Sequence, residues 1–356
     1  MFNYVRLWYR YFQVEVLSVP GKVIALFFFV FLGFLPLFAN SPQILRILIL
    51  AGIYAIFAVS WDMLAGYTGQ VSLGHGLFFA VAGYAAALFN LKLDFSPWAT
   101  IPLGALCAVG VGLIVAIPVL RLRGFYLAIV TLAFPIILTG ILFAFPDFTG
   151  GELGLFGLSR LTHSRLLDTY IVYVVMLISV MVMYKLTDGK SKMIRTGLIF
   201  QAIREDEIAA KKSGINTVKY KLLVFSLSAF FAGIAGGLYA HFIKIVGPSA
   251  LELTFSFQPV LWVIFGGMGT IYGGIVGVYI LYPFMEGLRF FPLGDEIRGV
   301  LFALILILTL LFMPEGIGVW IRDKIEVTCP RCKEINLSTR THCRICRAQL
   351  RLGDDQ

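Results

Sequence analysis

The stretch that decides the fold is QAIREDEIAAKKSGINTVKY, residues 201–220. It is the longest charged run in a chain that is otherwise mostly apolar, and segments long enough to enter a bilayer lie on both sides of it. It must therefore be a loop between membrane spans. Its residues nevertheless favour a helix, with Ile203, Glu207, Ala210 and Gly214 roughly on one face. Charged side chains around a face of small residues fit a surface that another protein can bind, but the charge pattern alone fits an ordinary solvated loop better.

The composition places the chain in a membrane. Of its 356 residues, 59% are hydrophobic and 14% are charged, whereas a soluble domain carries about 25% charged residues. The 36 Gly residues fit this class, because Gly allows helices to approach one another closely in lipid. The predicted fold class is therefore an all-α polytopic membrane protein.

Eight apolar segments come near the roughly 20 residues that a helix needs to cross a bilayer. We interpret the first as a span rather than a cleaved signal peptide, because Leu37-Phe38-Ala39 lacks the small-x-small cleavage pattern. Residues 1–22 before it are predicted to lie in the cytoplasm or at the membrane interface. The eight predicted spans are residues 23–39, 44–60, 71–91, 98–120, 125–145, 169–186, 222–246 and 298–313.

A further apolar region, residues 257–291, is interrupted by GGMGTIYGG at 266–274. The region is too long for one span, and the glycines weaken a helix at its middle. We predict a re-entrant hairpin of two short arms, since broken backbone at membrane depth is tolerated only inside protein or beside water. Two full crossings and one tilted crossing are the alternatives, and only the single crossing would change the side of the C-terminus.

The distribution of basic residues predicts the orientation. With the N-terminus inside, 22 of the 29 Lys and Arg residues fall in inward-facing segments, as the positive-inside rule expects. Both termini and the loop 187–220 are then cytoplasmic. The net charge of +9 is explained by this topology, so membrane lipid is an expected partner and nucleic acid is not.

A second informative stretch is GYTGQVSLGHG, residues 66–76. Four glycines with polar residues between them are unsuited to a lipid-facing helix. Either a helix begins only after Gly76, or a broken helix lines a polar path that can bind an ion or a zwitterion. The alternative is that the glycines are packing points and that His75 is hydrogen-bonded to a neighbouring helix. The residues predicted to line a path are Gln70, Ser72, His75 and Thr131.

The tail carries the sharpest chemical signal. Two C-x-x-C pairs separated by ten residues can each supply two thiolates to one tetrahedral Zn²⁺. A tail of about 35 residues has too little core to fold alone, which favours a structural metal. A catalytic zinc would need an open coordination position, and a disulfide reading would need an oxidising compartment, against the predicted topology. The predicted ligands are Cys329, Cys332, Cys343 and Cys346, with His342 surplus. The predicted domains are residues 1–22, 23–321 and 322–356.

Together these stretches resemble the branched-chain amino-acid (LivM-like) permease family of ABC importers. The resemblance is carried by AIREDEIAAKKSGINTVKYKLLVFSLSAFFAGIAGGLYA at 202–240 and by residues 66–76, by RLRGFYLAIVTLAF at 121–134, and by GGMGT at 266–270. The sequence departs from the family at Phe125, where an acidic residue is usual, and at Pro135-Ile136, where Gly-Glu is common. The four-cysteine tail is not part of the family pattern.

The resemblance implies a permease subunit of an ATP-driven importer in the cell membrane. Its cargo would be leucine, isoleucine, valine or a related small amino acid, urea or amide. The implied partners are ABC ATPase subunits, a homologous second permease and an extracytoplasmic solute-binding protein. The charged loop would dock into a cleft of the ATPase. The residues implied in this coupling are Arg204, Glu205, Asp206, Glu207, Ala209, Ala210 and Gly214.

Two other classes of function, a transporter or channel that needs no ATPase and a membrane-embedded zinc enzyme, fit the sequence less well. The chain has no G-x-x-x-x-G-K-[ST] phosphate loop, so ATP would be hydrolysed by a partner and the chain would not itself be an enzyme. An ATPase-independent secondary transporter or channel for a small polar solute is the main alternative, but the sequence offers no obvious set of unpaired intramembrane carboxylates. A membrane-embedded zinc enzyme would need ligands at depth, whereas the good ligands lie in the tail.

Overall fold

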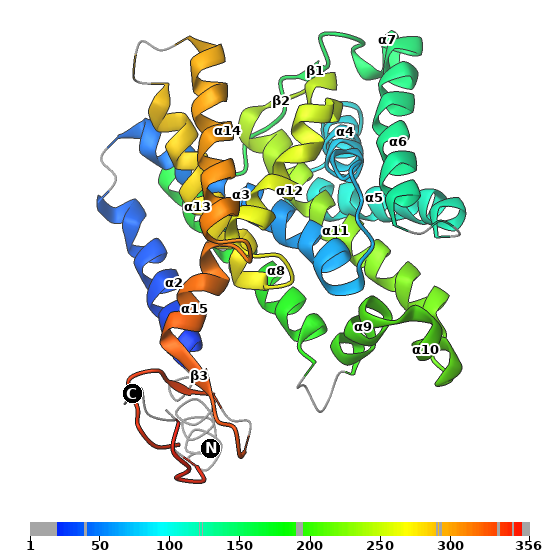
Figure 1. Cartoon of the computed structure of the whole chain (residues 1–356). Helices are drawn as coiled ribbons and strands as arrows, with labels where there is room; N and C mark the ends of the chain where they lie inside the picture. Colours follow the sequence, from blue (N-terminus) through cyan, green and yellow to red (C-terminus); the bar gives the residue numbers. More distant parts are fainter. Residues whose placement is uncertain are drawn as a thin grey trace, which may run out of the picture.

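The computed structural model describes residues 20–38, 41–120, 122, 124–189, 195–289, 291, 294–332, 335–343 and 345–350. Most of the predicted segment 1–22, residues 190–194 of the charged loop and the last six residues of the tail lie outside these ranges. Within them the chain is mostly helical (Figure 1). The longer helices are α2 Pro20–Phe38, α3 Pro42–Thr68, α4 Gly76–Leu93, α5 Pro97–Val119, α6 Phe125–Ala144, α8 Arg165–Thr187, α11 Thr217–Ile243, α12 Leu253–Gly266, α13 Ile271–Leu288 and α14 Asp295–Phe312.

Several short elements complete the chain. The short helices are α7 Pro146–Thr149, α9 Thr196–Glu205, α10 Glu207–Lys212, η1 Pro248–Leu251 and α15 Ile317–Ile325. The strands form two antiparallel pairs, β1 Leu155–Phe156 with β2 Ile245–Val246, and β3 Glu326–Thr328 with β4 Ile335–Leu337.

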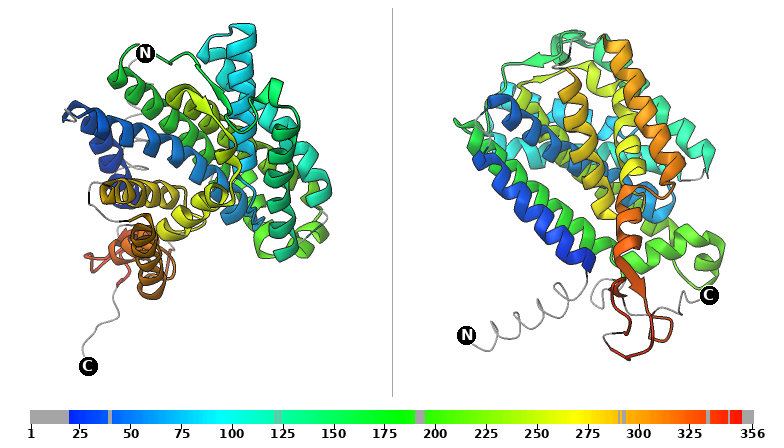
Figure 2. Two further views of the ribbon diagram at one scale, coloured as in Figure 1. Left: turned by 90° about the horizontal axis from the view of Figure 1, so that it is seen from above. Right: turned by 60° about the vertical axis from the view of Figure 1, so that its left-hand side comes forward.

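Helix α3 crosses the middle of the molecule (Figures 1 and 2). Every residue from Ile49 to Gly66 is buried, and α8, α11, α12 and α13 pack around it. The helix begins at Pro42 after Ser41, whose hydroxyl accepts a hydrogen bond from the Gln43 N–H at 3.3 Å. It ends at Gly69, which takes the left-handed conformation with φ +71°.

Eight helical segments among the described residues are long and apolar enough to cross a bilayer, which confirms the predicted number. The set differs from the predicted one in two places. Helix α13 is one of the eight, although we predicted it as a short hairpin arm. Helix α2, the predicted first span, is not among them, because its side chains are described only from Leu26 onward. The last of the eight, Glu296–Ile325, combines α14 and α15.

The short elements gather at the two ends of the helical body. Helices α9, α10 and α15 and the β3–β4 pair lie at one end, and α7 with the β1–β2 pair lies at the other (Figures 1 and 2). The charged loop and the tail thus share one side of the molecule. This is what the orientation deduced from the basic residues requires.

The chain between α3 and α4 differs from the predicted spans. We predicted that one span ends at Ser60 and the next begins at Val71, but α3 continues to Thr68 and α4 starts at Gly76. The helix continues past Ser60 because the polar residues that follow have partners inside the protein. The Trp61 indole N–H, for example, donates to the Ser72 carbonyl at 2.6 Å. Helix α4 thus begins at Gly76, close to the start that one reading of residues 66–76 predicted.

Helices α12 and α13 form a hairpin, with its connection at residues 267–270. The two helices meet backbone to backbone, because a Cβ at Gly277 would lie 1.9 Å from the Trp262 carbonyl oxygen. A Cβ at Gly266 would similarly lie 1.8 Å from the Gly273 carbonyl oxygen. The arms are unequal, with 14 residues in α12 and 18 in α13. The glycines therefore serve both the reversal of the chain and the close packing of its two arms.

Two glycines of α13 allow a matched test of this packing. We expect Gly277→Ala to lower the stability of the purified chain by about 1–3 kcal/mol, because the added methyl group has no space. Gly287→Ala should be neutral or slightly stabilising, because nothing lies within 4 Å of its Cβ position and alanine favours the helix. Thermal unfolding in detergent measures both changes. An equal loss in the two variants would contradict the proposed packing.

Candidate functional site

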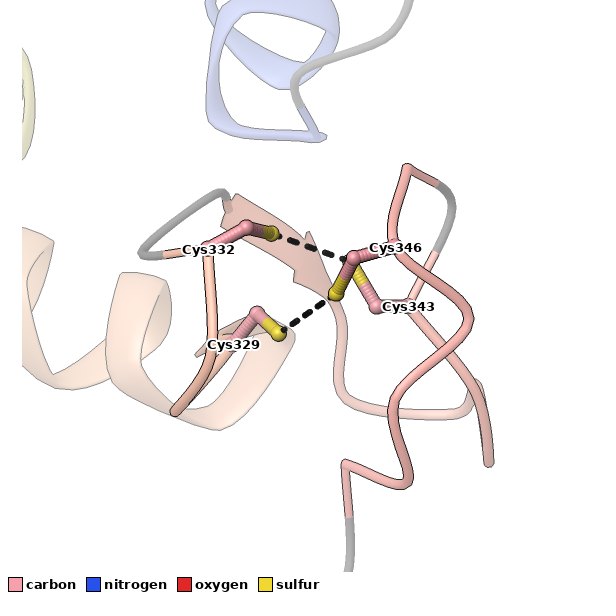
Figure 3. Close-up of side chains that lie close together, drawn as sticks. All are labelled: Cys329, Cys332, Cys343 and Cys346. Carbon is pink, nitrogen blue, oxygen red and sulfur yellow. Dashed lines mark hydrogen bonds between the residues drawn. The ribbon is translucent and has the colours of Figure 1, made fainter.

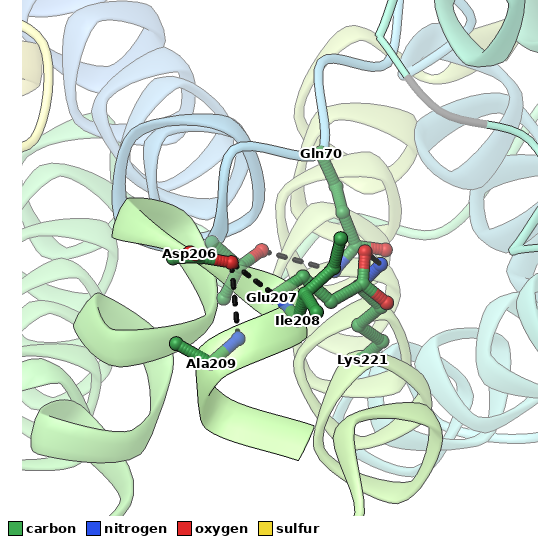
Figure 4. A network of polar contacts seen from close by, with 7 residues as sticks. Gln70, Asp206, Glu207, Ile208, Ala209 and Lys221 are labelled. Atoms are coloured by element: carbon green, nitrogen blue, oxygen red, sulfur yellow. Dashed lines mark hydrogen bonds and ion pairs between the residues drawn. The ribbon is translucent and has the colours of Figure 1, made fainter. Parts of the chain in front are cut away.

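The charged loop that was predicted as one helix is built from two. Helix α9 ends at Glu205, and α10 starts at Glu207. Between them the Asp206 carboxylate accepts hydrogen bonds from the backbone N–H groups of Ile208 at 2.8 Å and Ala209 at 3.0 Å (Figure 4). Asp206 is thus the N-cap of the second helix, a position that aspartate favours. The prediction of one continuous helix is wrong at this residue.

Three of the four residues on the face that was predicted to meet a partner are turned toward the membrane helices, whereas Gly214 is exposed. Ile203 and Ala210 are only 3% and 5% exposed. Glu207 forms an ion pair with Lys221 of α11 at 2.7 Å, and Gln70 extends toward this pair (Figure 4). Gly214, with φ +85°, follows the end of α10. The side chains that remain exposed on the loop include Glu205, Ile208 and Ala209.

Arg204 is exposed on the loop but also contacts α3. Its guanidinium group donates a hydrogen bond to the carbonyl oxygen of Gly66, near the end of α3. One turn earlier in α3, the Asp62 carboxylate accepts a hydrogen bond from the backbone N–H of Gly269 at 2.7 Å. We call these four residues, Asp62, Gly66, Arg204 and Gly269, the polar junction. It joins the charged loop, the centre of the fold and the connection of the α12–α13 hairpin.

Asp62 is a functional candidate that the sequence analysis missed. It is fully buried, and it was overlooked because the predicted span ended at Ser60. The available signal was its position as the sole acidic residue in the long apolar run 44–68, four residues before Gly66. A carboxylate at that spacing from a glycine faces the same side of a helix. A Cβ at Gly66 would lie 2.1 Å from the Asp62 carboxylate, so glycine is required there.

The extended segment 69–75 is held in the interior by side chains from two helices. Trp61 holds the Ser72 carbonyl, and the Leu73 N–H donates to the Thr131 hydroxyl at 3.0 Å. A Cβ at Gly74 would lie 1.9 Å from the Thr131 carbonyl oxygen, so the segment touches α6 through its backbone. The structure thereby brings Thr131 against a segment 58 residues away in sequence. All four residues predicted to line a path are buried, namely Gln70, Ser72, His75 and Thr131.

His75 is bound to a neighbouring helix, as one of the two readings of the sequence proposed. Its Nε2 lies 3.0 Å from the Ser60 hydroxyl of α3, and its ring stacks on Phe57 with centroids 5.3 Å apart. The Ser228 hydroxyl of α11 donates to the Ser60 carbonyl at 2.7 Å. This buried group links the start of α4 to α3 and α11.

The four cysteines of the tail come together as predicted. Their sulfur atoms all lie within 4.8 Å of one another (Figure 3). The sulfurs of Cys329 and Cys346 are 3.5 Å apart, as are those of Cys332 and Cys343. Four thiolates at about 2.3 Å from a central Zn²⁺ would lie about 3.8 Å from each other. The cluster therefore fits a closed tetrahedral site and can hold a metal ion.

Hydrogen bonds around the cluster favour the thiolate form. The backbone N–H groups of Cys346 and Ile345 lower the pKa of the Cys343 thiol to about 6. The Asn336 side-chain amide also lies 3.5 Å from the Cys343 sulfur. His342 stays outside the cluster of sulfurs, as predicted, and its Nδ1 lies 3.0 Å from the Thr341 hydroxyl. The N–H groups of Cys346 and Ile345 and the Asn336 amide thus donate to a sulfur of the cluster, as groups around the ligands of metal sites do.

The four-cysteine cluster is joined to the membrane helices through α15 and the backbone around it. Strand β3 follows α15 directly. Ser338, just after β4, donates its N–H to the Ile325 carbonyl at 2.7 Å and its hydroxyl to the Lys324 carbonyl at 2.8 Å. Gly318 of α15 packs on the α12–α13 hairpin, since a Cβ there would lie 2.7 Å from the Gly266 carbonyl oxygen.

Comparison with known proteins assigns this arrangement to a family. Residues 43–310 match the model of the branched-chain amino acid transport system / permease component. The chain belongs to the branched-chain amino-acid ABC transporter permease family. The matched region contains the polar junction and the segment 69–75, but it ends before the four cysteines. The four-cysteine cluster therefore lies outside the family core of this permease.

The permease is similar to curated transport proteins along most of its length. It is 31% identical over 306 residues to the high-affinity branched-chain amino acid transport system permease protein LivM of Salmonella typhimurium, covering 79% of this chain and 71% of the relative. It is 31% identical over 315 residues to the Escherichia coli LivM protein, covering 82% and 73%. It is 26% identical over 289 residues to the LivH permease protein of Salmonella typhimurium, covering 75% and 92%.

Proposed function

We propose that this permease is the membrane subunit of an ATP-driven importer that moves branched-chain amino acids into the cytoplasm. The cargo class is supported by the names of its relatives, which are branched-chain amino acid transport permeases. The partners we propose are ABC ATPase subunits, a homologous second permease and an extracytoplasmic solute-binding protein. The partner ATPase hydrolyses ATP, while this chain translocates the cargo. Related small amino acids, urea or amides are the further cargo class that the family suggests.

The proposed location is the cell membrane, with both termini and the α9–α10 loop in the cytoplasm. The basic residues support this orientation, because most of them lie in segments assigned to the inner side. The clustering of α9, α10 and the tail at one end of the molecule is consistent with it (Figure 1).

The polar junction is the observation that carries the proposed mechanism. A partner that moves α9 would act through Arg204 on Gly66, beside which Asp62 holds Gly269 in the hairpin connection. Closure of the ATPase would in this way shift α3 and the α12–α13 hairpin together. Such movement of packed helices as bodies is how a membrane core changes between outward-facing and inward-facing states. The loop's exposed residues, Ile208 and Ala209 among them, are the surface we assign to the ATPase.

One observation favours the alternative of an ATPase-independent secondary transporter. The second carboxylate oxygen of Asp62 has no hydrogen-bond partner among the described residues, and buried carboxylates carry protons in many such transporters. Its first oxygen is nevertheless bound by Gly269. Glu286, the other acidic candidate in an apolar helix, is paired with Arg289 at 3.0 Å, as predicted from their spacing. Family membership favours the importer.

For the four-cysteine cluster we propose a structural Zn²⁺. Four protein thiolates fill a tetrahedral site and leave no position for a substrate or water. The residues that would hold the ion are Cys329, Cys332, Cys343 and Cys346, whose sulfurs already lie within 4.8 Å of one another.

Capture of an ATPase by the full chain tests the importer. We expect the wild-type permease in detergent to retain the ABC ATPase with which it is co-expressed. Ala209→Glu should reduce this capture at least about tenfold, because a charged side chain is placed at the centre of the exposed contact surface. This position is preferable to Ala210, because Ala210 is buried and a charged side chain there would disturb the loop itself. Leu153→Glu, on the exposed loop at the opposite end, is the control.

Two outcomes would contradict the importer. If the wild-type chain captures no ATPase, the secondary transporter becomes the better explanation. If Ala209→Glu and Leu153→Glu both retain the ATPase as well as the wild type does, α10 is an ordinary charged loop rather than the coupling element.

A further inference from the structure

A cavity of about 460 Å³ opens at the end of the molecule opposite the charged loop. This volume lies in the range of about 300–1,000 Å³ that is usual for small-molecule pockets. Its walls come from α4, the end of α11, the segment around η1 and the loop after α7. The lining combines large apolar side chains, such as Phe79, Tyr239 and Ile243, with the carboxylates of Glu152 and Glu252. An apolar pocket with few charged groups suits a ligand that is partly apolar and partly charged.

One wall of this cavity leads to the first residue of α4. Phe79, Ala80 and Gly83 line the cavity, and Gly76 lies on the same face of the helix, one turn deeper. A Cβ at Gly76 would lie 2.5 Å from the Ser256 hydroxyl and 3.1 Å from the carbonyl oxygen of Ala250, itself a lining residue. The N-terminus of α4 therefore lies directly below the cavity. The start of a helix favours a negatively charged group.

Two buried polar atoms at this helix start have no hydrogen-bond partner among the described residues. They are the Ser256 hydroxyl oxygen and Nδ1 of His75, and both residues are fully buried. Buried polar groups in proteins are nearly always paired, so an unpaired group points to a ligand or a water molecule. Ser256 lies one turn after Glu252 in α12, with its N–H bonded to the Glu252 carbonyl at 3.1 Å. The start of α12 thus places the Ser256 hydroxyl one turn deeper than the Glu252 carboxylate.

We propose that this place binds the zwitterion of an aliphatic α-amino acid during transport. The Ser256 hydroxyl and the N-terminus of α4 hold the carboxylate of the amino acid, Glu252 holds its ammonium group, and the apolar lining receives its side chain. The proposal rests on the proposed function, which supplies the class of cargo. It adds a recognition site within the membrane subunit itself.

An aromatic stack closes the site in this structure. The Phe79 ring, in the cavity wall, lies 4.9 Å from the ring of Phe255, and Phe255 lies 5.5 Å from Phe57, which stacks on His75. The chain is therefore in a state in which the cavity is open and the helix start below it is covered. Binding requires Phe79 and Phe255 to separate.

Calorimetric titration of the purified full chain in lipid nanodiscs tests the proposal with three ligands. Leucine carries both charges, leucinamide lacks the carboxylate, and 4-methylpentanoate lacks the ammonium group. We expect Ser256→Ala to weaken leucine binding by about tenfold or more, since a hydrogen bond to a charged group is lost, and to leave leucinamide binding unchanged. Glu252→Gln should weaken the binding of leucine and leave the binding of 4-methylpentanoate unchanged. Ser249→Ala, which alters another hydroxyl at the cavity, should bind all three as the wild type does.

The outcomes separate this proposal from the proposed function. Binding that is equal in Ser256→Ala and the wild type would mean that the hydroxyl meets only water, and would overturn the proposal. Equal weakening of all three ligands, or no binding of leucine to the wild-type chain, would overturn it as well. Leucine uptake by the complete importer, measured in parallel, reports on the proposed function alone. Uptake that persists beside any of these results leaves the importer intact and removes only the site.

Discussion

Replacing Cys343 with serine is expected to release the metal ion from the tail and to unfold residues 326–350, while the membrane helices keep their structure. The described part of the tail has one short strand pair, β3–β4, one isolated bridge between His342 and Gln349, and little core of its own. Its folding energy must come largely from the metal, and structural Zn²⁺ sites contribute about 10–16 kcal/mol in small domains. Cys343 is the best choice of ligand, because it is buried and receives hydrogen bonds from both Asn336 and Ile345.

Metal analysis and limited proteolysis of the purified chain measure this effect. The wild type should contain one zinc per chain and resist cleavage in the tail, whereas Cys343→Ser should lose the zinc and be cut between β3 and the C-terminus. Cys107→Ser is the matched control, because Cys107 lies in α5 outside the cluster. A wild-type chain without metal, or a Cys343→Ser chain that keeps it, would refute the structural zinc.

The features that the sequence predicted correctly depend on neighbouring residues. About twenty apolar residues in a row suffice to predict a membrane span, so the number of spans followed from hydropathy alone. The paired C-x-x-C motifs predicted the four-cysteine cluster, because each motif places two sulfurs side by side within four residues of the chain. The ion pair of Glu286 and Arg289 followed from helical spacing.

The features that the sequence did not reveal depend on distant residues. Asp62 meets Gly269 across 207 positions of the chain, and no pattern within one sequence shows that pair. The end of α3 was predicted too early because its continuation depends on such partners. At Asp206 two local preferences competed. The helical spacing favoured a continuous helix, but the aspartate side chain bonds to the backbone ahead of it and starts a new helix instead.

The glycines of residues 66–76 combine a feature that the sequence predicted with one that depends on distant residues. Their number indicated that the backbone comes close to something, or departs from a helix. The structure shows both effects, because Gly69 ends α3 in the left-handed conformation and Gly74 touches the Thr131 backbone. Which neighbour each glycine meets was decided by α6 and the α12–α13 hairpin, far away in sequence.

Arg204→Met is expected to reduce leucine uptake by the complete importer at least about tenfold while leaving capture of the ATPase unchanged, since coupling between sites is typically worth 5–150-fold. The reason is the direction of the side chain. Arg204 is exposed on the charged loop, but its guanidinium group binds the Gly66 carbonyl inside this chain. Methionine keeps most of the length and the apolar stem but removes this hydrogen bond. The ATPase would then still dock, but its motion would no longer reach α3.

A matched control separates this role from simple loss of charge in the loop. Arg195→Met makes the same change at the exposed residue before α9, outside the polar junction, and should leave uptake unchanged. ATP hydrolysis by the reconstituted complex supplies the second measurement, because an uncoupled importer continues to hydrolyse ATP when uptake fails. Asp62→Leu, which removes the acceptor at similar side-chain volume, should give the same separation of hydrolysis from uptake, since Asp62 accepts the Gly269 N–H at the other side of the junction. If Arg204→Met instead loses the ATPase, Arg204 belongs to the docking surface, and the polar junction is not the path by which the two subunits are coupled.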